Sequence, residues 1–396
     1  MNEDTLVIDT IKINKSGVRD IFVPSRPVTH NFFCGRSSET SRIVNDISTP
    51  GLHVLLFGDR GVGKTSLANY SCSIVVDNGI KDKKIIVRCD KDDDFESISK
   101  RICDELCIDV TTKHTTTKNI SATIRPLSGG KNTSEETSVY YDFNSPGWIA
   151  KQICHLNYVI ILDEFDVISD KETKKKISQL LKNLSDEGAK TSFVIVGIAL
   201  SASELLEGHP SVYRCLSEIK LNRMTDEELV NIIEKGESRL SIIFDKDVKK
   251  RIVQSSSGFP YFTHLLALKT SEIAIVEERD SVTDQIYERG LSKAIDSIEA
   301  TLHEQYIDVV GENEKKKDLL YCASLLGNGE FTSKQLRAKY KEITGIDIEQ
   351  LEINNSIYKA ISESTSTILR RKTKTKGIYF FNDPRMPVYI KLLREA

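Results

Sequence analysis

The 396-residue sequence lacks both a long apolar run and a basic, apolar beginning. A helix that spans a membrane needs roughly 18 or more apolar residues, and a secretory signal starts with positive charge followed by an apolar stretch. The chain instead begins with the acidic segment MNEDTLVIDT. We therefore expect a cytoplasmic protein without a membrane partner.

Paired cysteines are also lacking. The sequence has eight cysteines, but none forms a CxxC pair and none lies at a zinc-ligand spacing from histidine. We expect reduced thiols in the interior and no structural zinc site. Repeats of about 20 to 50 residues, which would indicate a solenoid or a propeller, are absent as well.

Neither sign of charge dominates the whole sequence, whose net charge is −3. The charge is nevertheless unevenly distributed. From Gly311 to the end there are 16 Lys or Arg and 11 Asp or Glu residues, a net charge of +5, which leaves −8 for the first 310 residues. A modestly basic C-terminal part on an acidic body is a first indication of a nucleic-acid partner.

The composition, 39% hydrophobic and 29% charged, is that of a globular protein, and the length allows two or three domains. From residue 53 onward, apolar segments alternate with amphipathic helical patterns. Continuous apolar strands between helices predict an α/β fold, with a parallel sheet covered by helices on both faces. The expected strands lie at 53–58, 84–90, 158–166, 192–199 and 218–222.

Four parts of the chain differ in pattern. Residues 1–50 lead into an α/β domain that we expect to span residues 51–223. Within it, segment 111–146 is rich in Thr, Ser and Gly, and we expect a flexible or hairpin-like insertion there. Residues 224–310 are helical. In residues 311–396 three helices precede a two-stranded hairpin, the order of elements in a winged helix.

The segment GDRGVGKT at residues 58–65 lies between the first strand and a helical pattern. Its glycines permit positive φ and close backbone approach, so consecutive N–H groups can face phosphate oxygens at a helix N-terminus. Its lysine supplies charge to the β- and γ-phosphates and its threonine a ligand for Mg²⁺. This complete P-loop predicts ATP and Mg²⁺ as cofactors. The expected binding residues are Gly58, Asp59, Arg60, Gly61, Val62, Gly63, Lys64, Thr65 and Ser66, with Lys64 also catalytic and Thr65 a metal ligand.

A second motif, VIILDE at residues 159–164, places two carboxylates at the end of a buried strand. We expect Asp163 to hold magnesium and Glu164 to orient and polarise the attacking water. A carboxylate pair at a strand end can be a solvated turn, but the intact P-loop and the strand between the two motifs favour catalysis. The two motifs together predict a Mg²⁺-dependent ATPase and resemble the P-loop division with an additional strand and a catalytic glutamate.

Four segments carry a resemblance to a known family: FFCGRSSE before the P-loop, VIVGIALSASELLEGHPSVYRCLSEIKLNRMTDEEL after the glutamate, SSGFPYFTHLL in the helical part, and the C-terminal unit. Together they resemble bacterial AAA+ ATPases of the origin-recognition-like group, which are close to the STAND signalling ATPases. The resemblance covers nearly the whole chain except the insertion. It implies the strand order 5-1-4-3-2, a helical lid, a C-terminal winged helix and a homo-oligomer closed through the nucleotide site.

The same resemblance implies further site residues. Phe33, Gly35 and Arg36 would lie near the adenine. Arg214 would be an arginine finger, a guanidinium that reaches the γ-phosphate of a neighbouring subunit. An arginine at this position can also be an ordinary surface or capping residue.

Two positions depart from the family pattern. The first sensor position falls at Leu200 or Ser201, and we assign it to Ser201. In the lid, Pro260 stands where hydrolysing members carry an arginine, as in the GxP motif of STAND proteins, and this favours slow turnover or a nucleotide-held switch. His264 could reach phosphate, although a lone histidine on an apolar helix face is more often a core residue.

Cations alternate with threonine in RRKTKTKG near the end of the sequence. An extended wing would present them to phosphates without reading the bases. A basic hairpin can also be an exposed edge strand protected by lysines, and the same unit could dock a protein. The residues that we expect to contact duplex DNA are Arg370, Arg371, Lys372, Lys374 and Lys376.

Three functions remain open on the sequence. The first, which we favour, is an oligomerising, slowly hydrolysing ATP switch that engages DNA. The second is a STAND-like regulatory ATPase of a bacterial anti-phage defence system that controls a separate effector protein. The third is a scaffold that retains nucleotide for structural reasons.

Overall fold

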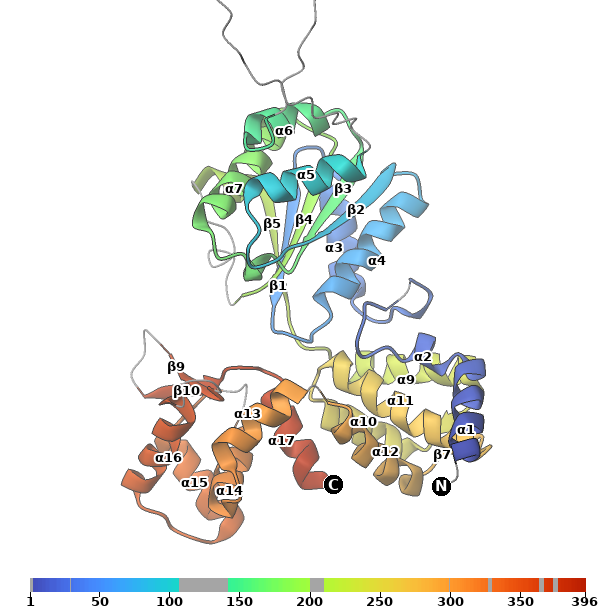
Figure 1. Cartoon of the computed structure of the whole chain (residues 1–396), viewed down its shortest axis with the longest axis vertical. Helices are drawn as coiled ribbons and strands as arrows, with labels where there is room; N and C mark the ends of the chain where they lie inside the picture. Colours follow the sequence, from blue (N-terminus) through green and yellow to red (C-terminus); the bar gives the residue numbers. More distant parts are fainter. Residues whose placement is uncertain are drawn as a thin grey trace, which may run out of the picture.

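The computed structural model describes residues 3–28, 30–106, 142–199, 210–298, 300–326, 330–362, 367–372 and 377–396. An α/β part lies at the top of Figure 1, with two largely helical groups below it. Among the described helices, none is long and apolar enough to cross a membrane. Ser201, Lys374, Lys376 and most of the predicted insertion 111–146 lie outside the described residues.

A five-stranded parallel sheet forms the centre of the α/β part. Its order, β2-β3-β4-β1-β5, is the predicted 5-1-4-3-2 order counted from the other edge, so the predicted α/β fold is confirmed. The strands are β1 (His53–Gly58), β2 (Lys83–Arg88), β3 (Tyr158–Asp163), β4 (Ser192–Ile198) and β5 (Leu216–Leu221).

Both faces of this sheet are covered. In β1, Val54 and Leu56 belong to one buried cluster while Leu55 and Phe57 belong to another, because successive side chains of a strand point to opposite faces. Helices α3 (Ser37–Ser48) and α4 (Lys64–Asp77) cover the first face. The second is covered by α5 (Phe95–Glu105), α6 (Pro146–Ile153) and α7 (Lys171–Asp186).

Side-chain caps begin the helices on the second face. At α5, Ser97 N donates to Asp94 Oδ1 (2.8 Å) while Asp94 N donates to Ser97 Oγ (3.2 Å), a capping box. At α7, Thr173 N donates to Asp170 Oδ2 (2.9 Å). Helix α4 differs, since it follows Gly63 with no side-chain cap. Its first N–H groups are therefore left for another acceptor.

Helices α9 (Asp226–Leu240), α10 (Lys246–Ser256), α11 (Pro260–Val276) and α12 (Asp284–Asp296) form the group at the lower right of Figure 1, joined by α1 (Glu3–Ser16) and α2 (Val18–Ile21). Two glycines allow close packing here. A Cβ on Gly236 would lie 2.1 Å from Phe22 Cζ, and one on Gly290 would lie 2.4 Å from Thr270 Cγ2. The two-residue strands β6 (Ile243–Phe244) and β7 (Ser281–Val282) pair beside these helices.

The C-terminal group contains a small antiparallel sheet of order β8-β10-β9. Its elements include the three expected helices and the hairpin, together with strand β8 and a final helix, neither of which the sequence pattern predicted. Helix α17 lies between this group and helices α10 and α12, which belong to the group that we call the lid helices, α9 to α12 (Figure 1). The elements are α14 (Glu314–Leu325), β8 (Glu330–Thr332), α15 (Ser333–Thr344), α16 (Gln350–Ser362), β9 (Leu369–Arg371), β10 (Ile378–Phe381) and α17 (Met386–Glu395). Helix α13 (Ala300–Val310) precedes them and contacts α14.

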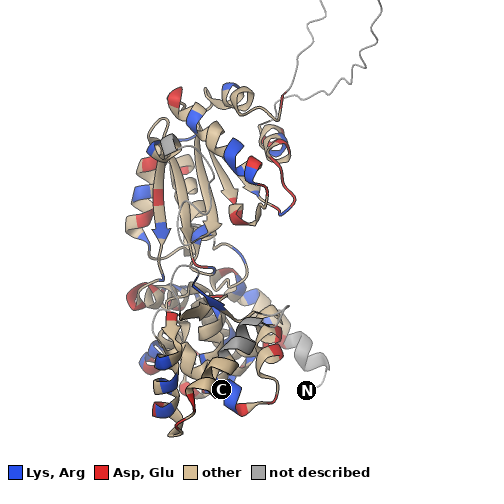
Figure 2. Ribbon diagram, turned by 90° about the vertical axis from the view of Figure 1, so that its left-hand side faces the viewer, with Lys and Arg blue, Asp and Glu red and all other residues tan. Residues whose placement is uncertain are grey.

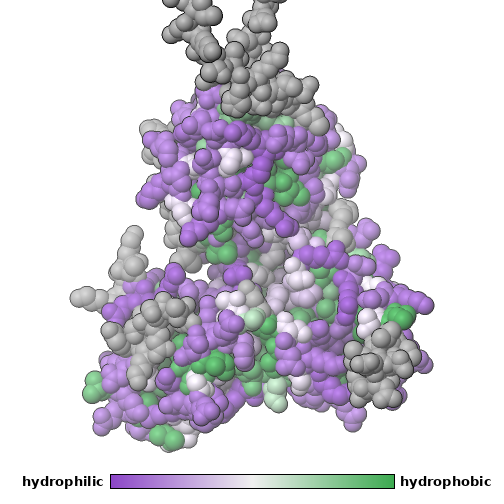
Figure 3. Space-filling model, in the orientation of Figure 1, coloured by the Kyte–Doolittle hydropathy of each residue, from purple (hydrophilic) through white to green (hydrophobic). Residues whose placement is uncertain are grey.

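Apolar burial extends through all these parts. One buried cluster includes residues of α3, α4, the lid helices and the C-terminal group, and the other lies between the sheet and α5, α6 and α7. On the face drawn in Figure 3, hydrophilic residues predominate and apolar residues form small separate groups. Packing between the elements therefore buries the apolar side chains of these two clusters.

Candidate nucleotide-binding site

The P-loop joins β1 to α4 through three glycines with positive φ, namely Gly58 (150°), Gly61 (84°) and Gly63 (94°). Residues with a Cβ rarely adopt such angles. At Gly58 there is also no room, because a Cβ would lie 2.4 Å from Leu221 O of the adjacent strand. The loop therefore directs its backbone to the uncapped start of α4, where N–H groups bind phosphate well.

Lys64 lies back along this loop. Its Nζ donates to Gly58 O (3.1 Å) and Asp59 O (2.7 Å), and the residue is 8% exposed. Burial lowers the pKa of Lys64 to about 8, against the opposing influence of nearby carboxylates such as Asp166. A phosphate would take the place of the carbonyl oxygens and supply the negative charge that favours the ammonium.

Thr65 and Asp163 meet across the gap between α4 and β3. Thr65 Oγ1 donates to Asp163 Oδ1 at 3.0 Å, and Asp163 is 3% exposed. Burial raises the pKa of Asp163, while hydrogen bonds from Thr65 and Glu164 N and the charges of Arg88 and Lys64 act to lower it. A hydroxyl beside a carboxylate is the hard oxygen donor set that Mg²⁺ takes together with phosphates, so these residues fit the ion.

Glu164 follows directly and has a left-handed backbone, with φ 57° and ψ 32°. A residue other than glycine in this region stores roughly 1–3 kcal/mol, and such strain is concentrated at functional sites. The short helix η2 (Phe165–Val167) begins after it. Asp166 Oδ1 of η2 accepts a hydrogen bond from Ile198 N (2.8 Å), which ties the ends of β3 and β4 together.

A cavity of about 610 Å³ lies between the sheet, the P-loop and the lid. This volume is within the range of small-molecule sites, about 300–1,000 Å³. Of the predicted site residues, the cavity is lined by Phe33, Arg36, Arg60, Gly61, Val62, Gly63, Lys64, Thr65, Ser66, Asp163, Glu164 and Pro260. Gly35, Gly58, Asp59 and Arg214 do not line it.

The cavity is also lined by Arg36, which is 5% exposed. Its Nη2 donates to Asn222 O (2.6 Å), whereas its buried Nε has no hydrogen-bond partner among the described residues. The ring of Phe33 stacks on Tyr70 with centroids 4.2 Å apart. An aromatic surface and an orphaned donor fit a heterocyclic base with acceptor nitrogens. Gly35 packs on the lid instead, since a Cβ there would lie 2.9 Å from Met224 Cε.

The start of α11 forms another part of the cavity wall. Pro260 Cγ would lie 3.7 Å from a Cβ on Gly63, so the lid helix contacts the P-loop. One turn later, His264 also lines the cavity, and its Nδ1 accepts a hydrogen bond from Val23 N (3.3 Å). Burial lowers the pKa of His264 to about 4. The ring is therefore neutral near pH 7, with its proton on Nε2.

Sequence reasoning missed three contributors to the cavity. The segment 23–28 lines one wall, and Val28 N donates to Ser66 Oγ (3.3 Å). Asp166 and Arg88 line the cavity as well. The only sequence signal for Arg88 was a charged residue at the end of an apolar strand, whose position beside Asp163 depends on which strands are neighbours.

The residues predicted to contact partners lie away from the cavity. Arg214 is exposed in η3 (Pro210–Cys215) and forms no ion pair with the described residues. In the hairpin, Lys372 Nζ donates to both carboxylate oxygens of Glu330 at 2.8 Å, and the Arg371 guanidinium lies 5.7 Å from the Tyr379 ring centre. Arg370 is exposed in β9.

Comparison with protein families gives a match over most of the chain. The family described as novel STAND NTPase 1 matches residues 25–320. The chain belongs to this family. As a novel STAND NTPase it is an ATP-binding P-loop NTPase of the AAA+ kind, and nucleotide hydrolysis is the general activity of such proteins. No curated protein matches the sequence.

Two solved structures are similar to this novel STAND NTPase over nearly its whole length. The Walker-type ATPase paby2304 of Pyrococcus abyssi has a TM-score of 0.53 and 13% identity, with 94% of this chain and 99% of that chain covered. The ORC2 protein of Aeropyrum pernix, solved as ADPNP–ADP complexes, has a TM-score of 0.52 and 16% identity, with 95% and 96% covered. At these identities the likeness shows a shared fold.

Proposed function

We propose that this protein is an ATP-controlled switch that binds Mg²⁺-ATP between the sheet and the lid, hydrolyses it slowly and changes its assembly with the nucleotide. In this proposal residues 51–223 bind nucleotide, residues 224–310 are the lid and residues 311–396 are a winged helix. One observation carries it: the lysine, threonine and two carboxylates of the nucleotide motifs line a single cavity that the lid also lines.

The roles follow from these positions. Lys64 would bind oxygens of the β- and γ-phosphates. Thr65 and Asp163 would hold Mg²⁺, which supplies positive charge to the phosphates. Glu164 would orient and polarise the attacking water. Phe33 and Arg36 would contact the base.

Slow turnover is supported by the lid. The described lid residues that line the cavity are uncharged: Met224, Ile232, Pro260, Tyr261 and the neutral His264. None of them can stabilise the charge that develops on the transferred phosphoryl group as an arginine would. ATP would therefore persist long enough to hold one state of the protein.

Arg214 supports assembly. It is exposed and does not line the cavity of its own chain, so its guanidinium is available to the phosphates of a neighbouring copy. The test is the mass in solution of wild type with ADP, wild type with ATP, and Glu164→Gln with ATP. We expect the last to be the largest species, and Arg214→Ala to remain small while still binding ATP. A single mass under all three conditions would contradict the switch.

The proposal also includes contact between duplex DNA and the C-terminal unit. Arg370 and Arg371 are exposed cations, but Lys372 is neutralised by Glu330. Lys and Arg are interspersed with Asp and Glu along the ribbon in Figure 2. We therefore expect weak, salt-sensitive binding of duplex DNA.

Fluorescence anisotropy with a labelled duplex at low salt tests this. Replacement of Arg370, Arg371, Lys372 and Lys374 by Glu should abolish binding. The control replaces Lys174 and Lys175 by Glu, on α7 of the α/β part, and should bind as wild type. Binding that survives the first replacement, or is absent from wild type, excludes the wing as a DNA-contacting surface.

The alternative is a STAND-like regulatory ATPase that controls a separate effector protein, as in bacterial anti-phage defence. Membership of the STAND family and Pro260 at the lid favour it. The test reads the genes on either side of this protein's own and co-expresses the chain with a nuclease or toxin encoded there. Stable association that differs between ADP and Glu164→Gln with ATP would support this function, and association indifferent to nucleotide would exclude it.

A further inference from the structure

The cationic side chains that line the cavity differ in whether other groups of the protein already bind them through hydrogen bonds or ion pairs. Arg26 is paired with Asp20 at 2.8 Å, and Arg36 Nη2 donates to a backbone carbonyl at 2.6 Å. Lys64 donates to two carbonyls of its own loop. Arg88 lines the same cavity, yet its guanidinium forms no hydrogen bond or ion pair with the described residues. Its charge acts on the neighbouring Asp163, but its hydrogen-bond donors are not used by the described residues.

The sheet fixes where this side chain starts. Arg88 ends β2, and the strand register places it beside Asp163, which ends β3, with neighbouring strands about 4.8 Å apart. Lys84 and Arg88 lie on the same face of β2 because side chains alternate. Lys84 Nζ donates to Ser73 Oγ of α4 (2.9 Å), so this is the α4 face. Arg88 thus leaves the sheet on the face, and at the edge, where the P-loop starts α4.

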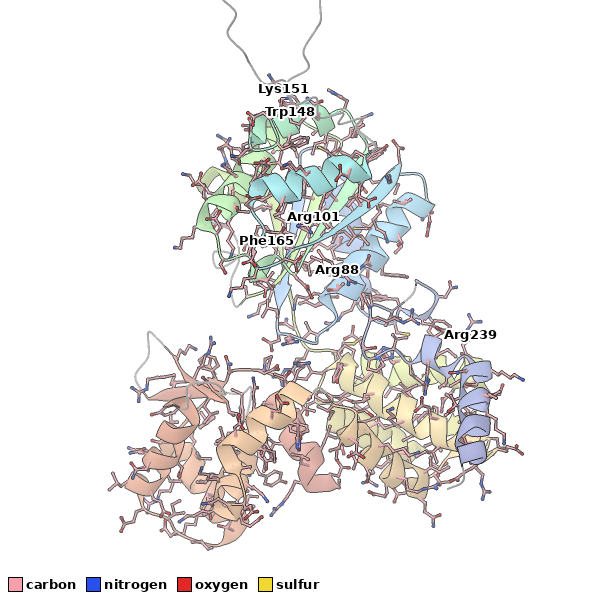
Figure 4. The ribbon with its side chains drawn as sticks, in the orientation of Figure 1. Arg88, Arg101, Trp148, Lys151, Phe165 and Arg239 are labelled. Carbon is pink, nitrogen blue, oxygen red and sulfur yellow. The ribbon has the colours of Figure 1, made fainter. Side chains whose placement is uncertain are left out.

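The backbone at Arg88 is braced. Arg101 Nη1 donates to Arg88 O at 2.6 Å, and the Arg101 guanidinium also pairs with Asp93. The Asp93 carboxylate accepts from Asp90 N (2.7 Å) and Ser97 Oγ (2.8 Å) as well. In Figure 4 Arg88 lies near the lower end of the sheet, with Arg101 above it. This network holds the main chain while the Arg88 side chain reaches the cavity.

The direction of a bound triphosphate follows from the same neighbours. Lys64 and Thr65 lie at the start of α4, which follows β1, and Asp163 and Glu164 lie at the end of β3, which is two places from β1 in the sheet and next to β2. A phosphate chain that runs from the P-loop toward Glu164 brings its terminal phosphate closest to Arg88. A diphosphate ends one phosphate short of that position.

We propose that the Arg88 guanidinium binds the γ-phosphate of ATP from within the same chain and so distinguishes ATP from ADP. The assignment rests on the proposed nucleotide switch and gives it a further catalytic residue. A guanidinium keeps its charge at all physiological pH values and presents paired donors to phosphate oxygens. The same contact stabilises the charge on the γ-phosphoryl oxygens during hydrolysis.

The test compares ADPNP and ADP, each with Mg²⁺, as ligands of the full chain by titration calorimetry. We expect Arg88→Gln to weaken ADPNP binding at least about 10-fold, to leave ADP binding within about 3-fold, and to slow single-turnover hydrolysis of ATP about 100-fold. Arg88→Lys keeps the charge but lacks the paired donors of a guanidinium, so its loss of ADPNP affinity should lie between those of wild type and Arg88→Gln. If Arg88→Gln does not fold, Arg88→Lys gives the ratio of ADPNP to ADP affinity instead. Equal loss for both nucleotides, or no loss for either, overturns the assignment.

Lys91→Gln is the matched control, because Lys91 is an exposed cation that follows Arg88 closely in the sequence and does not line the cavity. It should keep the wild-type ratio of ADPNP to ADP affinity. A change as large as that of Arg88→Gln would show a general charge effect and overturn the assignment. If wild type binds neither nucleotide, the switch itself fails. If wild type binds both nucleotides and Arg88→Gln keeps the wild-type ratio of their affinities, the role assigned to Arg88 is wrong while the nucleotide switch is not contradicted.

Discussion

At Lys64, burial works against the charge that phosphate binding needs. The side chain satisfies its ammonium with two carbonyls of the loop, and its pKa falls to about 8 from the ordinary 10.5. A phosphate raises the pKa again, because negative charge favours the ammonium form. Nucleotide binding at Lys64 is therefore linked to proton uptake.

We predict that ATP affinity falls as pH rises from 7 to 9. The physical reason is that the ligand-free protein loses its Lys64 proton as pH passes through about 8, and this proton must be regained on binding. Titration calorimetry in two buffers of different ionisation enthalpy measures the protons taken up. We expect uptake at pH 8.5 and almost none at pH 6.5. Equal uptake at both values would contradict the lowered pKa.

At the scale of elements, the turn from β1 into α4 depends on a close approach between strands. Gly58 has φ 150°, and a Cβ there would lie 2.4 Å from Leu221 O of β5. By contrast, Gly79 follows α4 with φ 68°, and a Cβ there would meet nothing within 4 Å. A comparison of the two glycines therefore distinguishes the cost of a positive φ, which both have, from the cost of a steric clash, which only Gly58 would suffer.

We predict that Gly58→Ala destabilises the fold by several kcal/mol, on the order of an overpacked core site, and also weakens ATP binding. The β1–β5 pair must separate to admit the methyl group, and this moves the P-loop. Gly79→Ala should cost only about 1 kcal/mol, for the left-handed backbone alone. Urea unfolding monitored by circular dichroism measures both. Equal losses of stability would show that the contact with Leu221 is relaxed without cost.

Helix α9 begins with a capping box that also holds Arg36. Thr225 N donates to Glu228 Oε2 (2.9 Å), and Arg36 N donates to Glu228 Oε1 (2.8 Å). Glu228 therefore fixes both the start of the lid and the segment that carries Arg36. The helix cap thus supports Arg36, a residue of the cavity wall.

We predict that Thr225→Ala costs about 1 kcal/mol of stability and leaves ATP affinity nearly unchanged. Glu228→Ala should cost more and also weaken ATP binding several-fold, because Arg36 N then loses its acceptor. Thermal unfolding and nucleotide titration of both variants make the comparison. If Thr225→Ala lowers ATP affinity as much as Glu228→Ala does, the effect comes from helix fraying and not from Arg36.

At the scale of the molecule, α17 connects the C-terminal unit to the rest. Arg251 of α10 donates to Asp284 (2.6 Å) and to Glu395 of α17 (3.0 Å), while Ser255 Oγ donates to Glu395 Oε2 (2.8 Å). Before α17, Arg385 packs on the P-loop, where a Cβ on Gly61 would lie 3.2 Å from its Cδ.

We predict that Arg251→Met loosens α17 from the lid and lowers stability by about 1–3 kcal/mol, since it leaves carboxylates without their shared partner at a partly exposed site. Hydrogen exchange should rise selectively in residues 386–395. Arg289→Met is the control, because Arg289 forms one exposed pair with Glu277 and should cost no more than about 1 kcal/mol. Unchanged exchange in α17 would show that apolar packing alone holds it.

Contiguous motifs made part of the site predictable from sequence. Lys64, Thr65, Asp163 and Glu164 each lie in a short segment whose backbone geometry is local, and the structure brings them into one cavity. Arg88 could not be assigned in that way. Its proximity to Asp163 depends on β2 pairing with β3, which involves residues about 75 positions apart.

By itself the sequence determined the α/β class and the phosphate-binding loop, because side-chain period and glycine backbone freedom act over a few residues. The strand order came from the family likeness and not from any local pattern. Only the tertiary structure decided which groups share the cavity: Arg88 from β2, the wall 23–28, and His264 held by Val23. Such contacts join distant segments through packing and strand register, and neither leaves a local trace in the sequence.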